Sequence, residues 1–213
     1  QMRSPVLHSA PYGTLAVFTD GIMHPGEGFD MHPHRNLEIV SVILEGEVTH
    51  QDSTGNVVKM PAGSVQHITA GAGIFHAEHT TSPQSVRMYQ IWFAPHTPNL
   101  PPSYERMSYQ EQLQKDHLFA LVSQDSAKSA LTMNADGAIH IGDFRAGHAA
   151  DYSLAAARKL FVFVADGRLR IGDEVLTSQD HARIDGVATV RLEAEADTQF
   201  IVIEVQQNDS RLY

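Results

Sequence analysis

The sequence predicts an all-β protein built from two similar sandwiches or barrels. Its apolar residues fall in short strand-like runs that are separated by glycine and proline turns, and no stretch between them keeps a helical period. The second half resembles a degenerate copy of the first, and a chain of 213 residues is long enough for two copies of about 100 residues each. These two observations favour packed β-sheets over a fold that alternates strands with helices.

The strands expected in the first half lie at residues 38–44, 48–50, 57–60 and 86–93. The first of them is β-branched and apolar and ends at a turn around Gly46. A cluster of turn-forming residues at 52–56 separates the second run from the third at the spacing of a hairpin.

A break in this pattern follows. Residues 94–103 contain four prolines, which is too many for a helix or a central strand. We predict a proline-rich linker near residues 94–107 and a short polar helix over 108–115. The strand pattern then resumes at residues 139–144, 160–165, 168–171, 187–192 and 199–205. The predicted domains are therefore 1–107, which includes the linker, and 108–213.

The internal repeat is clearest around two glycines. The segment Val42-Ile-Leu-Glu-Gly46-Glu-Val48 corresponds to Phe163-Val-Ala-Asp-Gly167-Arg-Leu169. In both, an apolar strand is followed by an acid, a glycine, a charged residue and an apolar residue, and then by a hairpin-like turn and a second strand.

Composition excludes several classes of function. Fifteen Lys and Arg against 25 Asp and Glu give a formal charge of −10, so we expect a solvated acidic surface and no direct binding of nucleic acid. No run approaches the roughly 18 apolar residues of a membrane span, and the absence of cysteine excludes disulfides and thiol catalysis. The first residues carry no apolar signal region, so we expect a cytoplasmic protein. The sequence does not determine the oligomeric state, for which a monomer is the simplest expectation.

Histidine is the informative residue type. The chain has 13 histidines, and they include the pair His32-Pro-His34. Two residues at i and i+2 of an extended chain point to the same face, and the same spacing recurs in His76-Ala-Glu78. Two such pairs facing each other supply three imidazoles and one carboxylate, a donor set that suits a first-row divalent metal with open positions for a substrate.

The chain resembles the pirin family of bicupins. Gly26-Glu-Gly-Phe-Asp-Met-His32-Pro-His34 matches the first cupin motif, in which a glycine and five further residues precede a His-x-His pair. The other matching segments are His34-Arg, Leu44-Glu-Gly-Glu, His50-Gln-Asp-Ser, Pro61-Ala-Gly-Ser-Val-Gln66, Thr69-Ala-Gly-Ala-Gly-Ile-Phe-His76-Ala-Glu78, Gln90-Ile-Trp-Phe and Leu100-Pro-Pro-Ser-Tyr-Glu105. The resemblance implies a bicupin of two jelly-roll-like β-barrels.

It also implies a metal centre and an activity. The family's iron ligands fall here on His32, His34, His76 and Glu78, so we expect one divalent transition metal per chain, with Fe(II) favoured over other first-row ions. Some members of the family have quercetin 2,3-dioxygenase activity, which makes a flavonol-like small molecule and dioxygen the expected substrates. Glu78 is then the expected catalytic base for the flavonol hydroxyl.

Two alternatives stay open. One branch of the family acts as a transcriptional co-regulator, so a non-enzymatic protein that senses redox state through its iron needs the same four ligands. A metal-dependent isomerase acting on a small carbohydrate is permitted by the fold but is supported by no residue.

Other polar residues near these motifs are not expected to bind the metal. The acidic ligand of other cupins lies five residues after the second histidine, whereas Glu38 comes one residue earlier and so faces the other side of its strand. We interpret Glu38 as structural, orienting a histidine ring. His67 is one residue away from the position of a third cupin histidine, and His50 and His79 are expected at the rim or on the surface.

The second half should bind no metal. His32 and His34 lie at fixed distances before Gly46. The residues at the same distances before Gly167 are Ser153 and Ala155. Because the imidazole pair is absent there, the C-terminal barrel is expected to contribute packing or a second wall of the pocket.

Overall fold

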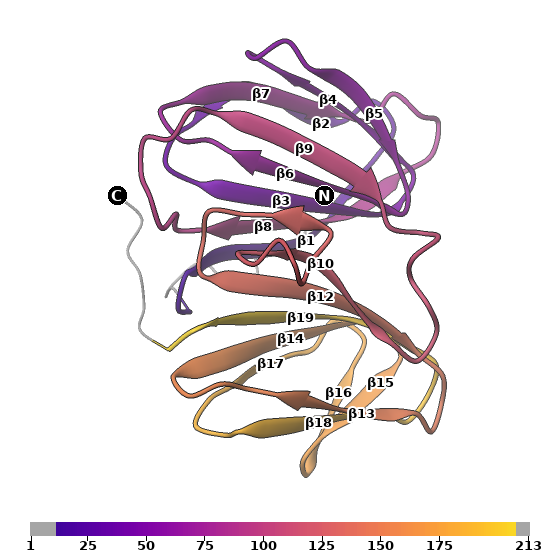
Figure 1. Ribbon diagram of the computed structural model, residues 1–213. Coiled ribbons are helices and arrows are strands. Elements are labelled where there is room, and N and C mark those ends of the chain that lie inside the picture. Colours follow the sequence, from indigo (N-terminus) through magenta and orange to yellow (C-terminus); the bar gives the residue numbers. More distant parts are fainter. Residues whose placement is uncertain (1–11, 208–213) are drawn as a thin grey trace. The chain divides into compact units, whose positions relative to one another are not determined.

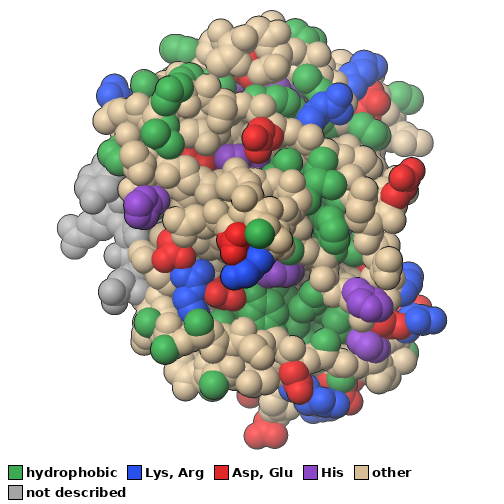
Figure 2. Space-filling view, viewed as in Figure 1, with side chains coloured by type: hydrophobic (Ala, Val, Ile, Leu, Met, Phe, Trp, Pro, Cys, Tyr) green, Lys and Arg blue, Asp and Glu red, His purple; other side chains and the backbone are tan. Residues whose placement is uncertain are grey.

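The computed structural model describes residues 12–207, and these form β-strands, turns and irregular segments without a helix. This confirms the all-β prediction. Within the described range, no helix is long and apolar enough to cross a membrane. Figure 2 shows acidic side chains interspersed with Lys and Arg on the face it draws, rather than gathered into one patch.

The chain divides into two compact units, and the first comprises residues 12–110 and 133–136 of the described range. It consists of two antiparallel sheets (Figure 1). The first sheet has the order β1 (Leu15–Met23), β8 (Val86–Phe93), β3 (Glu38–Glu45), β6 (Ser64–Thr69) and β9 (Ser103–Ser108). The second has the order β2 (Gly28–His34), β7 (Ile74–His79), β4 (Glu47–Asp52) and β5 (Val57–Pro61). Apolar side chains from both sheets pack together between them.

The second unit comprises residues 111–132 and 137–207 of the described range and is also built from two sheets. One has the order β11 (Leu131–Thr132), β10 (Leu118–Ser123), β12 (Gly137–Phe144), β19 (Thr198–Gln206), β14 (Arg158–Asp166) and β17 (His181–Ile184). The other has the order β13 (Ala149–Ser153), β18 (Thr189–Ala194), β15 (Arg168–Ile171) and β16 (Glu174–Thr177).

The two units repeat one topology. The order β2-β7-β4-β5 of the first recurs as β13-β18-β15-β16 in the second, and β1-β8-β3-β6 recurs as β12-β19-β14-β17. Gly46 and Gly167 occupy the same turn in each, with φ of +76° and +101°. A Cβ atom would lie 2.5 Å from the carbonyl oxygen of Ser85 at the first glycine and 2.3 Å from that of Asp197 at the second. Both positions therefore require glycine, and the internal repeat is confirmed.

The region after the prolines differs from the expectation. The helix predicted over 108–115 is absent, since these residues form the end of β9 and then turns. Part of the segment predicted as linker, residues 103–108, is a strand that pairs with β6. Proline density ends at Pro102, so the residues that follow keep their backbone donors and can join the sheet.

Candidate metal centre

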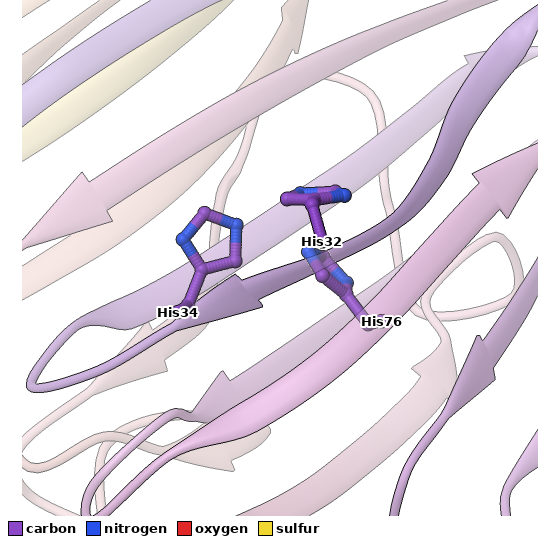
Figure 3. A group of neighbouring side chains, drawn as sticks. All are labelled: His32, His34 and His76. Atoms are coloured by element: carbon purple, nitrogen blue, oxygen red, sulfur yellow. The ribbon is translucent and has the colours of Figure 1, made fainter.

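The two histidine-containing pairs lie on neighbouring strands, β2 and β7. His32 is directly opposite His76 in this antiparallel pair, and the register shifts between Phe29 and His32 at a β-bulge. One ligand atom each from His32, His34 and His76 lies within 4.8 Å of the others. Figure 3 shows the three imidazoles directed into one common space. The prediction that the two pairs face each other is therefore met for the three histidines.

The electrostatic environment keeps the imidazoles of His34 and His76 neutral at pH 7. Burial, reinforced by the neighbouring His32, lowers the pKa of His34 to about 4. Burial, together with the neighbouring His34 and His32, lowers the pKa of His76 to about 3. The neutral imidazole is the form that binds metals, so these two side chains need not lose a proton before a cation binds.

Unpartnered nitrogens show that the residues fit a metal ion. His76 is 1% exposed, and neither of its ring nitrogens has a hydrogen-bond partner. A buried polar atom without a partner destabilises the fold by about 1–3 kcal/mol, and a bound cation would remove this penalty. The Nδ1 atom of His32 lies 2.7 Å from the carbonyl oxygen of Asp30, which leaves Nε2 for the pocket.

Glu78 is fully buried near His76 and is held by uncharged donors. Gln66 Nε2 donates to Oε1 at 2.5 Å, Gln90 Nε2 donates to Oε2 at 2.6 Å, and Ser41 Oγ donates to Oε1 at 3.3 Å. These three donors are cross-strand neighbours on β6, β8 and β3. Burial raises the pKa of Glu78, although His50 and these hydrogen bonds oppose the rise.

His50 is not at the rim, as the sequence suggested, but fully buried. It lies opposite Glu78 in the β4–β7 pair, and Asp52 lies opposite His76. One ligand atom each from His50, His76 and Glu78 lies within 4.8 Å of the others. The missed signal is the alternation along β4, where Val48, His50 and Asp52 are buried while the residues between them are not.

Glu38 and His67 form a separate buried pair. Glu38 Oε2 lies 2.7 Å from His67 Nε2 and accepts hydrogen bonds from the Thr69 hydroxyl and the backbone N–H of Asn134, both at 3.0 Å. Neither residue belongs to the groups of described side chains that could hold a metal. Glu38 thus contacts a histidine, as expected, but this histidine is His67 and not one of the candidate ligands. His79 is half-exposed, as expected.

Trp92 contributes an apolar wall beside the histidines. Its ring meets that of His34 edge-on at a centroid distance of 5.1 Å. Its strand partner is Ile39, which is fully buried. The tryptophan is partly buried and packs against the apolar cluster that contains Ile39, while its ring edge also reaches His34.

The C-terminal unit has no comparable cluster among its described residues. Tyr152 pairs with Val190 across β13 and β18, in the place where His32 pairs with His76. The counterparts of the two histidines are thus Tyr152 and Leu154, one residue earlier than the count from Gly167 indicated. The expected absence of an imidazole pair is unaffected by this shift.

Comparison with known proteins agrees with this geometry. The sequence profile of Pirin matches residues 4–93, and that of the quercetinase C-terminal cupin domain matches residues 120–205. The chain is 30% identical to a pirin-like protein of Caulobacter vibrioides over 194 residues, which are 91% of this chain and 84% of that one. The chain belongs to the pirin family.

Relatives and solved structures extend this result. This pirin is 29% identical to a quercetin 2,3-dioxygenase of Escherichia coli over 91% of its own length and 83% of that protein's. The crystal structure of the bacterial pirin YhhW of Escherichia coli in complex with nickel(II) superimposes with a TM-score of 0.89 at 25% identity, covering 96% of this chain and 91% of that one. The architecture of two cupin domains is thereby established.

Proposed function

We propose that this pirin binds one divalent metal ion, with Fe(II) favoured, through His32, His34, His76 and Glu78. The observation that carries the proposal is His76, whose two ring nitrogens are buried and unpartnered beside two further imidazoles and a buried carboxylate. The nickel(II) complex of YhhW supports a metal in a relative of the same fold.

We further propose that the pocket cleaves a flavonol or a similar enolic compound with dioxygen, in the manner of a quercetin 2,3-dioxygenase. The family relatives that carry this name support the substrate class. A bound metal would act as a Lewis acid that lowers the pKa of the flavonol hydroxyl and would supply the redox chemistry for dioxygen.

The chain's own residues would prepare the substrate. Glu78 is the proposed acceptor of the hydroxyl proton, because burial raises the pKa of its carboxyl and so strengthens it as a base. Gln66 and Gln90 hold this carboxylate through their amide groups. Trp92, at the side of His34, offers an apolar surface to an aromatic ring.

The test is turnover of quercetin by iron-loaded protein. Protein loaded anaerobically with Fe(II) and then mixed with quercetin and air should bleach the flavonol absorbance and release one carbon monoxide per flavonol consumed. Metal-free protein and the His32→Ala/His76→Ala variant serve as controls. Wild-type protein that holds iron and leaves flavonols unchanged would overturn the dioxygenase proposal and favour a redox-sensing co-regulator.

A further inference from the structure

His50 presents a free nitrogen to the interior of the N-terminal barrel. Its Nε2 lies 2.9 Å from Asp52 Oδ2, and its Nδ1 is buried without a partner. Because the Asp52 carboxylate accepts a hydrogen from Nε2, the tautomer that results carries a lone pair on Nδ1.

Two neighbours, Asp52 and Tyr104, hold the His50 ring in place. The Asp52 carboxylate also accepts four hydrogen bonds at 2.7–3.2 Å from the backbone and side chains of Thr54 and Asn56. On its other side, the His50 ring stacks on Tyr104 at a centroid distance of 4.5 Å and an interplanar angle of 17°. A carboxylate that fixes one nitrogen while the other stays free is the usual support of a metal-binding histidine.

Two further donors lie close to the His50 ring. The strand register places His50 opposite Glu78, and their ligand atoms lie within 4.8 Å of each other and of a ring nitrogen of His76. His67 also has an unpartnered Nδ1, but it lies outside this group. Proximity to other donors is therefore what distinguishes His50 from an ordinary buried histidine.

The uncompensated charge of Glu78 also favours a cation near His50. Glu78 is fully buried, and its hydrogen-bond donors within residues 12–207 are the uncharged Ser41, Gln66 and Gln90. A buried carboxylate without a cation is destabilising unless it is protonated. A divalent cation close to Glu78 would supply the missing positive charge.

We propose that the pocket has a second, inner cation position formed by His50 through Nδ1, His76 and Glu78. It shares His76 and Glu78 with the proposed outer site, which adds His32 and His34, so the two positions compete for one ion and the stoichiometry stays at one per chain. This inference rests on the proposal that the pocket binds a metal, but it does not depend on flavonol turnover.

The test is a titration of tag-free protein with Co(II) alone, followed by its visible absorption and by calorimetry. The His32→Ala/His34→Ala variant removes two donors of the outer position and keeps all three donors of the inner one. We expect it to bind one Co(II). Adding His50→Ala should weaken this binding by at least the roughly 10–100-fold that follows the loss of a supporting residue, whereas adding His24→Ala, at an exposed position, should leave it unchanged.

The outcomes separate the two proposals. If wild-type protein binds Co(II) and the His32→Ala/His34→Ala variant does not, the inner position is wrong and the outer site stands. If wild-type protein itself binds none, both proposals fail. Circular dichroism verifies that each variant is folded. If His50→Ala is unfolded, His50→Gln replaces it, because glutamine keeps the volume and a donor for Asp52. Equal affinities with and without His50 would also overturn the inference.

Discussion

The N-terminal and C-terminal barrels share one topology and fill it in opposite ways. In the C-terminal barrel, 11 buried apolar residues form one continuous cluster. In the described part of the N-terminal barrel, apolar clusters of six and five residues lie apart from each other, and polar side chains occupy several positions that are apolar in the C-terminal barrel. All buried side-chain atoms without a partner in the described range belong to residues 38–92.

The strand registers show which substitutions cause this difference. Alignment on the equivalent glycines and strand pairs matches Ser41 with Val162, His50 with Ile171, Gln66 with Ala182, His76 with Val190, Glu78 with Leu192 and Gln90 with Val202. Each buried apolar side chain stabilises a fold by about 1.5–3 kcal/mol. The N-terminal barrel lacks this contribution at several positions, and in exchange it contains a pocket of metal donors. The same topology thus accommodates either an apolar interior or a cluster of buried histidine and carboxylate side chains.

The largest expected effect comes from removing donors. His32→Ala combined with His76→Ala should abolish metal binding, with a loss larger than the 10–100-fold typical of an outer supporting residue. Glu38→Gln is the matched control, because Glu38 contacts His67 and Thr69 instead of the pocket. Metal analysis of the purified proteins measures this. A Glu38→Gln protein that is folded but metal-free would contradict the separation of the two buried clusters.

Next in size is the effect of the shared glycines. Gly46→Ala and Gly167→Ala should each lower the free energy of unfolding of their own barrel by about 3 kcal/mol, since both combine a left-handed backbone with a collision against a carbonyl oxygen. Gly55→Ala is the control: its φ is +99°, but no atom lies within 4 Å of its added Cβ, so about 1 kcal/mol is expected. Hydrogen exchange by mass spectrometry assigns each loss to a barrel. Unequal effects at the two glycines would weaken the structural equivalence of the turns.

A smaller effect should follow from exchanging one equivalent pair. Val162→Ser places an unpartnered hydroxyl in the apolar cluster and should destabilise the C-terminal barrel by about 2 kcal/mol. Ser41→Val should change the stability of the N-terminal barrel less, while weakening metal binding through the loss of one donor to Glu78. Denaturant unfolding can be followed for the N-terminal barrel by Trp92, the only tryptophan of the chain. Equal destabilisation by both substitutions would show that the two interiors do not differ as described.

The smallest expected effect is a difference in acid sensitivity between the metal-free barrels. Burial lowers the pKa of His34 to about 4 and that of His76 to about 3. In the C-terminal unit burial also lowers the pKa of His140, but the nearby Glu204 opposes this shift. When the pKa of a histidine is lower in the folded than in the unfolded state, the fold is most stable above the unfolded-state pKa near 6.5. This stability is lost as the pH falls from there toward the folded-state pKa. Hydrogen exchange between pH 7 and 4.5 should therefore show β7 losing protection before β18. The reverse order would indicate that histidine burial does not govern acid stability here.

Much of this molecule could be predicted from sequence because strand periodicity is a local property. Strand periodicity predicted that His32 and His34 share one face of their strand and that His76 and Glu78 share one face of theirs. It also predicted that Glu38 faces away from the position of the acidic ligand in other cupins. The role of His50 was missed because its partners Glu78 and Tyr104 come from strands distant in the sequence. The counterpart of His32 was misplaced by one residue because counting along the chain cannot detect a change in length between β13 and β14.

The β-bulge of β2 has a consequence for how this pocket can be lost. Phe29 pairs with Glu78 and His32 pairs with His76, so the bulge accommodates one more residue in β2 than in β7. Deletion of one residue between Phe29 and His32 would restore a regular ladder with the same two opposite pairs, so both positions would stay on the face of Glu78 and His76. The corresponding pair β13–β18 runs without such a shift. A single-codon deletion between Phe29 and His32 should therefore leave His32 and His34 beside His76, so the site is lost through replacement of its histidines and not through the length of this segment.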